Sequence, residues 1–438
     1  MDRGAATGEG LAGASRPRRI TFISSNPDWG GSELLWSAAA AALAEDGHIV
    51  SVLQGRIDES EPRIRRLREL GCPIRNFRKL PFVPRWLQSG PTDFGWPIVY
   101  ALKMLRLHFA LWRARPDLVV LSQSGNLDGL YLLKRVRRRG LPYVIICHKA
   151  TDMEWPEDRD IEDMRSHYRD ALACWFVSRQ NLLLTEEQIG TRFPHASVVR
   201  NPFLVPWEGD QNWPDASAGL RLACVGRLHP REKGQDMLLR VLARDKWKQR
   251  PVHVSFFGSG QHEEALRRMA GLLELENVTF AGYAEDAATI WRDHHALLLS
   301  SRAEGLPIVI VEAMLCGRVP IVTDVGGAEV ITDNVDGFLA AAPTEDSFDE
   351  ALERAWQRRD EWPSIGKAAA DTMRRLVPPD PVRPLADRLA HMAAGLPAEP
   401  ERLEASQRPG ISDDLHEAPG KEQKVAGKQQ QVDRMMES

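Results

Sequence analysis

Two glutamates eight residues apart, Glu304 and Glu312, form the sharpest chemical pattern in the chain. Glu304 comes just after an apolar run (ALLLSS), and Glu312 lies inside a helical stretch that opens after Gly305-Leu306-Pro307. Proline suits a first helical turn, because the amide proton that it lacks would have no partner there. The free amides of such a helix start favour an anion. We therefore expect a phosphate-bearing ligand here, with a glutamate on each side to accept its hydroxyl groups. Solvated surface charges are the alternative.

Two cations, Arg227 and Lys233, make a second pattern, six residues apart. An apolar run (RLACVGRL) contains Gly226-Arg227, and Lys233-Gly234 opens the following helical stretch. The planar fork of arginine and the point charge of lysine are suited to neutralise a diphosphate. The spacing therefore predicts a diphosphate site at this strand-to-helix loop, with exposed surface cations as the alternative.

These loops need a sheet to position them, and the chain alternates short apolar runs with amphipathic stretches. That alternation is typical of parallel strands covered by helices. The sequence thus predicts an α/β protein of two Rossmann-like doubly wound domains that face each other across a cleft, with the ligand at the carboxyl ends of the strands. The expected strands are 20–25, 48–53, 117–122, 143–148, 173–178, 197–202, 221–228, 252–258, 278–283, 296–301 and 319–324.

Local composition sets the expected domain boundaries. The segment between the two series of strands is rich in Pro, Asp, Ser and Gly, and the end of the chain is polar with almost no aromatic or β-branched residues. The expected parts are a disordered segment at 1–18, an N-terminal acceptor domain at 19–203, a linker at 204–219, a C-terminal donor domain at 220–380, a terminal helix at 381–396 and a disordered tail at 397–438.

The overall composition excludes several classes of protein. Hydrophobic residues make up 43% of the chain and charged residues 27%, which excludes a fibrous or wholly disordered protein. No run of apolar residues is long enough to span a bilayer, and the start of the chain lacks the apolar region of a signal peptide, so we expect a cytoplasmic protein. The five cysteines are widely spaced and are predicted to be buried free thiols.

Taken together, these motifs resemble a known family. Gly226-Arg227-Leu228 with Lys233-Gly234, then Phe257-Gly258-Ser259-Gly260, then Ser301-Arg302-Ala303-Glu304-Gly305-Leu306-Pro307 with Glu312-Ala313 are similar to the donor domain of family 4 retaining glycosyltransferases of GT-B fold, the glycosyl transferases group 1. Gly317, Pro320 and Gly326-Gly327 extend the resemblance, which covers about 221–339. It is weaker in the N-terminal half, where Gly30-Gly31-Ser32-Glu33 resembles the family's glycine loop.

The resemblance implies a hexosyltransferase that takes a sugar from a nucleotide diphosphate sugar and keeps its anomeric configuration, with no metal or other cofactor. It implies that Arg227 and Lys233 hold the diphosphate and stabilise it as leaving group. Glu304 would contact hydroxyls of the transferred sugar, and Glu312 those of the ribose. His148 occupies the position of a histidine that lines the transferred sugar in related enzymes, with a structural hydrogen bond as the alternative.

The resemblance also implies a set of binding residues. Gly30 and Gly31, which carry no side chain, would let the backbone approach the donor phosphate. The expected catalytic residues are Glu304, His148, Arg227 and Lys233, and the expected substrate-binding residues are Gly30, Gly31, Arg227, Lys233, Glu304, Gly305, Leu306, Pro307, Ile308 and Glu312. The chain departs from many relatives at Asn201-Pro202-Phe203-Leu204, where they have Asn-Gly-Val-Asp, so acceptor-side details are not carried over.

The N-terminal half is strongly basic. Between Arg63 and Arg139 there are 17 Lys and Arg against 4 Asp and Glu. One stretch interleaves cations with aromatic residues, as suits an anionic membrane surface at the inner face of the plasma membrane. A glycan or lipid-linked acceptor of the cell envelope would explain it, and a solvated basic face with core aromatics is the alternative. The stretch consists of Arg63, Arg65, Arg66, Arg68, Arg75, Phe77, Arg78, Lys79, Phe82, Arg85 and Trp86.

Other readings remain open or are rejected. Asp158-Arg159-Asp160 mimics a metal-binding Asp-x-Asp, but it sits in an acidic run instead of just after an apolar strand, so we expect no metal there. A nucleotide-sugar epimerase of the same fold is one alternative, and it would need no acceptor. A nucleic-acid-binding protein that uses the basic half is another, although no nucleic-acid-binding signature supports it and we expect no nucleic-acid partner.

Overall fold

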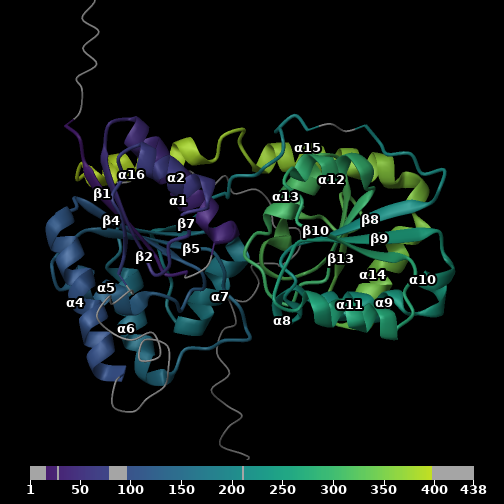
Figure 1. Ribbon diagram of the computed structural model, residues 1–438, viewed down its shortest axis with the longest axis horizontal. Helices are drawn as coiled ribbons and strands as arrows, with labels where there is room; N and C mark the ends of the chain where they lie inside the picture. The colour runs from purple at the N-terminus through teal and green to yellow at the C-terminus, as the bar shows by residue number, and fades with distance from the viewer. Residues whose placement is uncertain (1–15, 27–28, 78–95, 210–211, 397–438) are drawn as a thin grey trace, which may run out of the picture. The chain divides into compact units, whose positions relative to one another are not determined.

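The structure is a computed structural model, and it describes residues 16–26, 29–77, 96–209 and 212–396. Most of the expected disordered segment at 1–18 and the whole expected tail lie outside these residues. The described chain forms two parallel β-sheets, each covered by helices (Figure 1). The predicted α/β class with two Rossmann-like domains is therefore confirmed.

The first sheet has seven parallel strands in the order β3-β2-β1-β4-β5-β6-β7. Phe22 of β1 pairs with Val52 of β2 on one side and with Val120 of β4 on the other, so the order reverses beside β1. Ligands of doubly wound sheets bind beyond the carboxyl ends of the strands at such a reversal. The strands are β1 (Arg19–Ser24), β2 (Ile49–Gln54), β3 (Ile74–Asn76), β4 (Leu118–Gln123), β5 (Tyr143–Cys147), β6 (Ala173–Phe176) and β7 (Ala196–Val198).

The second sheet has six parallel strands in the order β10-β9-β8-β11-β12-β13, and its reversal lies between β8 and β11. The two chemical patterns of the sequence follow these two strands, so the sheet topology brings both to one edge. The strands are β8 (Leu220–Val225), β9 (Val252–Phe257), β10 (Val278–Gly282), β11 (Ala296–Leu299), β12 (Val319–Thr323) and β13 (Phe338–Ala340).

Helices connect the strands of both sheets, and the described part of 204–219 contains neither helix nor strand. In the first half the helices are α1 (Gly31–Glu45), α2 (Pro62–Glu69), α4 (Trp96–Ala114), α5 (Leu130–Arg137), α6 (Asp158–Arg169) and α7 (Arg179–Ile189). In the second half they are α8 (Pro230–Lys233), α9 (Gln235–Leu242), α10 (Asp245–Gln249), α11 (Glu263–Leu272), α12 (Ala287–Asp293), α13 (Ile308–Leu315), α14 (Glu345–Gln357), α15 (Trp362–Leu376) and α16 (Val382–Ala393), with short 3-10 helices at Gly326–Val330 and Arg359–Glu361.

Three short strands differ from the expectation. β3 and β13 were not predicted, and the expected strand at 197–202 is only β7, which ends at Val198. All three lie at the edges of their sheets and have three residues each. A run of three residues is too short to show a periodic pattern, and an edge strand is paired on one side only.

The expected terminal helix, α16, belongs to the core of the first sheet. Leu385 and Leu389 are almost fully buried in the same apolar cluster as Trp36 of α1. The chain therefore leaves the second sheet after α15 and returns to cover the first. The two halves are therefore connected both by the 204–219 segment and by the chain that leads from α15 to α16.

The basic stretch is mostly surface and partly core. Phe77 is buried, so its interpretation as a membrane-facing aromatic is wrong, because its side chain fills the core of the first sheet. Arg66 and Arg68 form ion pairs with Glu45 and Glu59. The remaining expected positions Arg78, Lys79, Phe82, Arg85 and Trp86 lie outside the described residues.

Two further expectations concern membranes and thiols. No helix in the described ranges is long and apolar enough to cross a membrane. All five cysteines are buried and free, as predicted (Cys72, Cys147, Cys174, Cys224 and Cys316). Burial raises the pKa of the Cys72 thiol to about 11, so this thiol is unreactive near neutral pH.

Candidate functional site

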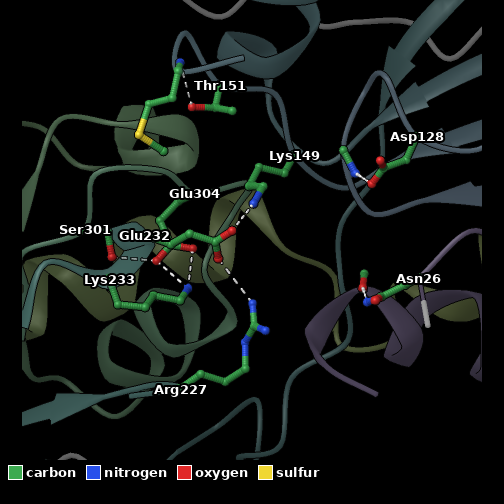
Figure 2. A network of polar contacts seen from close by, with 12 residues as sticks. Asn26, Asp128, Lys149, Thr151, Arg227, Glu232, Lys233, Ser301 and Glu304 are labelled. Atoms are coloured by element: carbon green, nitrogen blue, oxygen red, sulfur yellow. Dashed lines mark hydrogen bonds and ion pairs between the residues drawn. The ribbon is translucent and has the colours of Figure 1, made fainter. Parts of the chain in front are cut away.

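The loop after β11 presents Glu304 to Lys233, the last residue of the short helix α8 that follows β8. The Nζ of Lys233 donates to both carboxylate oxygens of Glu304, at 2.6 Å and 2.8 Å, and the Ser301 hydroxyl donates to Oε1 at 2.6 Å (Figure 2). Both charged side chains are largely buried, with exposures of 19% and 7%. Charge-assisted hydrogen bonds of this kind hold a carboxylate in one orientation. The two patterns of the sequence therefore meet in space, 71 residues apart in the chain.

Arg227 joins the same cluster through a carboxylate that the sequence analysis did not single out. The Nη2 of Arg227 donates to Glu232 Oε2 at 3.2 Å, and the Nζ of Lys149 donates to Oε1 at 2.8 Å (Figure 2). Burial tends to raise the pKa of Glu232, but the hydrogen bond from Lys149 and the nearby charges of Arg227 and Lys233 outweigh it, so the pKa is lowered. Below, the charged network means Lys149, Arg227, Glu232, Lys233, Ser301 and Glu304.

In the sequence, Lys149 and Glu232 are marked only by their positions next to His148 and Lys233. Lys149 follows His148 just after β5, and Glu232 precedes Lys233 in α8. Because Lys149 belongs to the first half of the chain and Glu232 to the second, only their pairing in three dimensions reveals them. The charged network thus draws side chains from both halves.

Close backbone packing holds the two loops of the second sheet together. Gly234 has φ +63°, and a Cβ there would lie 1.8 Å from the carbonyl oxygen of Ser300. The Ser300 hydroxyl donates to the carbonyl oxygen of Gly234 at 2.9 Å, and the amide of Arg302 donates to the carbonyl oxygen of Glu232 at 2.7 Å. Only glycine permits this approach, which explains the Lys-Gly pair of the sequence.

The loop from Glu304 to α13 lies against the first half of the chain. A Cβ on Gly305 would meet the carbonyl oxygen of His148 at 1.8 Å, and one on Gly31 would meet Ile308 at 3.3 Å. Leu306 is buried, and Pro307 precedes the first residue of α13 instead of lying in its first turn. The expected binding residues of both halves are therefore neighbours at this loop.

His148 is buried, and its Nε2 is 3.1 Å from the hydroxyl of Ser122. Burial lowers the pKa of His148 to about 4, so the ring is neutral near neutral pH. Within the described residues its Nδ1 makes no hydrogen bond of good geometry, although the nearby side chain of Asn201 opposes part of the fall in pKa. A neutral ring with one free nitrogen can exchange a hydrogen bond with a ligand hydroxyl.

Glu312 lies apart from the charged network. It is buried in α13, and its Oε1 accepts a hydrogen bond from the amide of Leu204 at 3.0 Å. Burial raises the pKa of Glu312 to about 7, and the Leu204 bond offsets only part of that rise. Its expected contact with ribose hydroxyls stays a prediction.

The glycine loop after β1 is organised by a second buried glutamate. Glu33 accepts hydrogen bonds from the amide of Gly30 at 3.0 Å, the hydroxyl of Ser32 at 2.7 Å and the side-chain amide of Asn26 at 3.1 Å. It has no exposed surface, and burial raises its pKa to about 7. Glu33 therefore sets the conformation of the turn that carries Gly30 and Gly31.

Metal-binding side chains do not gather in the described residues. Asp158 and Asp160 lie in the exposed first turn of α6, where Arg159 pairs with Asp160 and Glu157. No three His, Cys, Asp or Glu side chains of the described ranges are grouped so as to hold a metal ion. The charges available at the candidate site are thus those of the charged network.

Comparisons with known proteins agree with this geometry. Residues 219–358 match the family described as glycosyl transferases group 1, and residues 30–202 match the glycosyl transferase 4-like domain. The fold matches that of Anabaena HepE in complex with UDP and glucose, with a TM-score of 0.65, 19% identity, and coverage of 86% of this chain and 100% of that one. Each half of the chain therefore matches a glycosyltransferase family model, and the fold is that of the GT-B glycosyltransferases.

Other similar proteins show how broad the likeness is. Sucrose-phosphate synthase of Thermosynechococcus elongatus has a TM-score of 0.64 at 16% identity, covering 86% of this chain and 99% of its own. A GDP-mannose-dependent alpha-(1-6)-phosphatidylinositol monomannoside mannosyltransferase of Mycolicibacterium smegmatis is 32% identical over 242 residues, which are 49% of this chain and 61% of the relative. A glycogen synthase of Pseudomonas syringae is 32% identical over 145 residues, 33% of this chain and 30% of the synthase. The chain thus spans less than two thirds of these two curated relatives.

Proposed function

We propose that this GT-B protein transfers a hexosyl group from a nucleotide diphosphate sugar to an acceptor, with retention of the anomeric configuration. The observation that carries the proposal is the meeting of Arg227, Lys233 and Glu304 beside the reversal point of the second sheet. A doubly wound sheet binds its ligand at this place. HepE, which has the same fold, binds UDP and UDP-glucose, in support of a nucleotide-sugar donor.

The charges of the network suit a diphosphate. In the structure Arg227 and Lys233 each bind a carboxylate, and phosphate oxygens offer the same bidentate acceptor geometry. A diphosphate would therefore exchange places with Glu232 at Arg227 and share Lys233 with Glu304. When the bond between the sugar and the diphosphate breaks, these cations would stabilise the charge that develops on the leaving group.

The glutamates and the histidine supply groups for the sugar. Glu304, held by Lys233 and Ser301, keeps carboxylate oxygens beside the expected position of the transferred sugar. His148 is neutral and can accept or donate one hydrogen bond there. Glu312 would bind the ribose hydroxyls once its bond to Leu204 is exchanged. No metal is assigned a part in this scheme.

The acceptor is proposed to be a glycan or lipid-linked saccharide of the cell envelope. The similar mycobacterial enzyme is named for a mannoside of phosphatidylinositol, and another relative, 33% identical over 102 residues, for Vi polysaccharide biosynthesis in Salmonella typhi. We place the reaction in the cytoplasm, since five free cysteines suit a reducing compartment. Neither family match describes an epimerase or a nucleic-acid-binding protein.

The deciding experiment is a thermal-shift screen of the full chain against a panel of UDP- and GDP-sugars. A ligand at 100 times its dissociation constant adds about 2.7 kcal/mol to the free energy of unfolding, which is easily measured. Turnover of the best ligand is then followed with candidate acceptors, and the anomeric configuration of the product is read by NMR. Nucleotide release that needs no acceptor would favour the epimerase. Activity that is lost in EDTA and restored by manganese would contradict the metal-free scheme.

A further inference from the structure

Helix α4 exposes four large hydrophobic side chains along one side. The exposed fractions are 62% for Leu105, 57% for Phe109, 50% for Trp112 and 38% for Leu102. Their spacing of three, four and three residues places them on one helical face. No other helix in the described ranges carries more than one large hydrophobic residue of comparable exposure. These four side chains are called the α4 face.

The opposite side of α4 is already used by the fold. Met104, Leu107 and Leu111 are buried in the core of the first sheet. The helix is therefore apolar on two sides, and the fold covers one of them. A helix that is apolar all round is normally buried, and exposed apolar patches mark interaction surfaces. We therefore expect the α4 face to bind an apolar partner.

Cations outnumber carboxylates around the α4 face, where one exposed carboxylate, Asp117, accepts a hydrogen bond from the amide of Arg19. Helix α4 contains no Asp or Glu, but it contains Lys103, Arg106 and Arg113. A groove beside it is lined by Trp112 and Ile49 and by four arginines. These arginines are Arg19, Arg75, Arg113 and Arg115. Their guanidinium groups form no ion pair with any residue that the structure describes. An apolar face with an arginine-lined groove is complementary to a surface that is both apolar and anionic.

We propose that the α4 face and the arginine groove dock this chain onto an anionic lipid bilayer. The apolar side chains lie among the upper acyl chains, and lipid phosphates occupy the groove. Phe109 and Trp112 stack with ring centroids 5.6 Å apart, and aromatic side chains of this kind favour the headgroup level. Each cation near an anionic surface strengthens binding about five-fold.

This surface lies at a different edge of the first sheet from the candidate site. The groove is lined by Arg19 and Ile49, the first residues of β1 and β2. The glycine loop with Gly30 follows the carboxyl end of β1. A bilayer on α4 therefore leaves the carboxyl ends of the strands open. The proposal does not depend on the donor chemistry. It adds α4 to the expected membrane contact and keeps Arg75 of the stretch 63–86, which lines the groove.

Vesicle flotation of the full chain tests the proposal. Phosphatidylcholine vesicles are compared with vesicles that also contain phosphatidylglycerol, at low and high salt. Leu105→Ser/Phe109→Ser removes the most exposed apolar side chains, and Arg75→Gln/Arg113→Gln removes two groove cations. Leu272→Ser, on α11 of the second sheet, is the matched control because Leu272 is 84% exposed. Circular dichroism and thermal unfolding check that each variant folds.

We expect the wild-type chain and Leu272→Ser to float with the phosphatidylglycerol vesicles and to be released by salt. The partition coefficient should fall at least about ten-fold in Leu105→Ser/Phe109→Ser and in Arg75→Gln/Arg113→Gln. Failure of the wild type to bind, or equal binding of the folded double variants, overturns the proposal. So does a dimer of the wild type that Leu105→Ser/Phe109→Ser dissociates without any change in vesicle binding. Because flotation does not measure turnover, its outcome is separate from that of the donor screen.

Discussion

The two sheets place different chemistry at the same topological position. Beside the reversal of the second sheet, Glu304 is bound by the cation of Lys233. Beside the reversal of the first, Glu33 is bound by neutral donors and is fully buried, and its pKa is raised to about 7. The loops of the second sheet offer the cations Arg227 and Lys233, which can bind phosphate oxygens. In the loop of the first sheet, the carboxylate of Glu33 fixes the turn that carries the glycines. The loop beside the reversal point therefore supplies charged side chains in the second sheet, whereas in the first sheet it fixes the conformation of the backbone.

The largest effect should come from removing the cations of the second loop. Arg227→Ala/Lys233→Ala should lower kcat at least about 1000-fold, because each cation stabilises the charge that develops on the leaving diphosphate. Steady-state release of nucleotide measures it. Arg267→Ala is the control, since Arg267 pairs with Glu263 on the exposed side of α11. Full activity of a folded double variant would refute the diphosphate assignment.

The next effect concerns the glutamate of the same loop. Glu304→Gln keeps the shape of the side chain but removes the charge that Lys233 and Ser301 orient, so kcat should fall about 100-fold. The dissociation constant of the free nucleoside diphosphate should change little, and calorimetry measures it. Equal kcat for variant and wild type would remove Glu304 from the list of catalytic residues.

The first loop should respond in stability and pH dependence. Burial raises the folded-state pKa of Glu33 from its usual 4.5 to about 7, so its contribution to stability is complete below the unfolded pKa and is lost as the pH rises through 7. Glu33→Gln cannot ionise and should flatten the fall in unfolding free energy between pH 5 and pH 8 by about 2–3 kcal/mol. Urea unfolding at the two pH values measures this.

Glu312→Gln is the matched control for that experiment, because burial also raises the pKa of Glu312 to about 7. Glu312→Gln should also flatten the fall in unfolding free energy between pH 5 and pH 8. If the slope of Glu33→Gln equals that of the wild type, the buried carboxylate of the first loop is not the titrating group.

The smallest effect should come from the ion pair between Lys149 and Glu232, which connects the two halves of the chain. Lys149→Ala removes the bond to Glu232, so the KM for the donor should change about three- to ten-fold with little change in kcat. Lys149→Arg should restore part of it, since guanidinium also binds a carboxylate. A loss confined to kcat would place Lys149 among the groups that act on the reacting bond.

Much of the site could be expected from the sequence. The Glu304 and Glu312 spacing, the Arg227 and Lys233 pair and the alternation of apolar runs all reflect local rules of strand, turn and helix. Glu232 and Lys149 could not be expected, because their pairing spans 83 residues and depends on how the halves meet. The strands β3 and β13 were not predicted, because three residues are too few to show the alternation of apolar and polar residues that indicates a strand. The sequence left Phe77 undecided between core and membrane surface, because an aromatic residue among arginines looks the same in sequence in both places, and its burial favours the core.

The sequence by itself indicated the two series of strands and helices and the loops that carry charge, since these follow from patterns of residues close along the chain. Only the tertiary structure decided which carboxylate binds which cation, that Glu33 lies in a dry turn, and that α4 leaves an apolar face uncovered. Those outcomes depend on burial and on contacts between distant segments. The free energy of a charge or an apolar surface is set by what surrounds it.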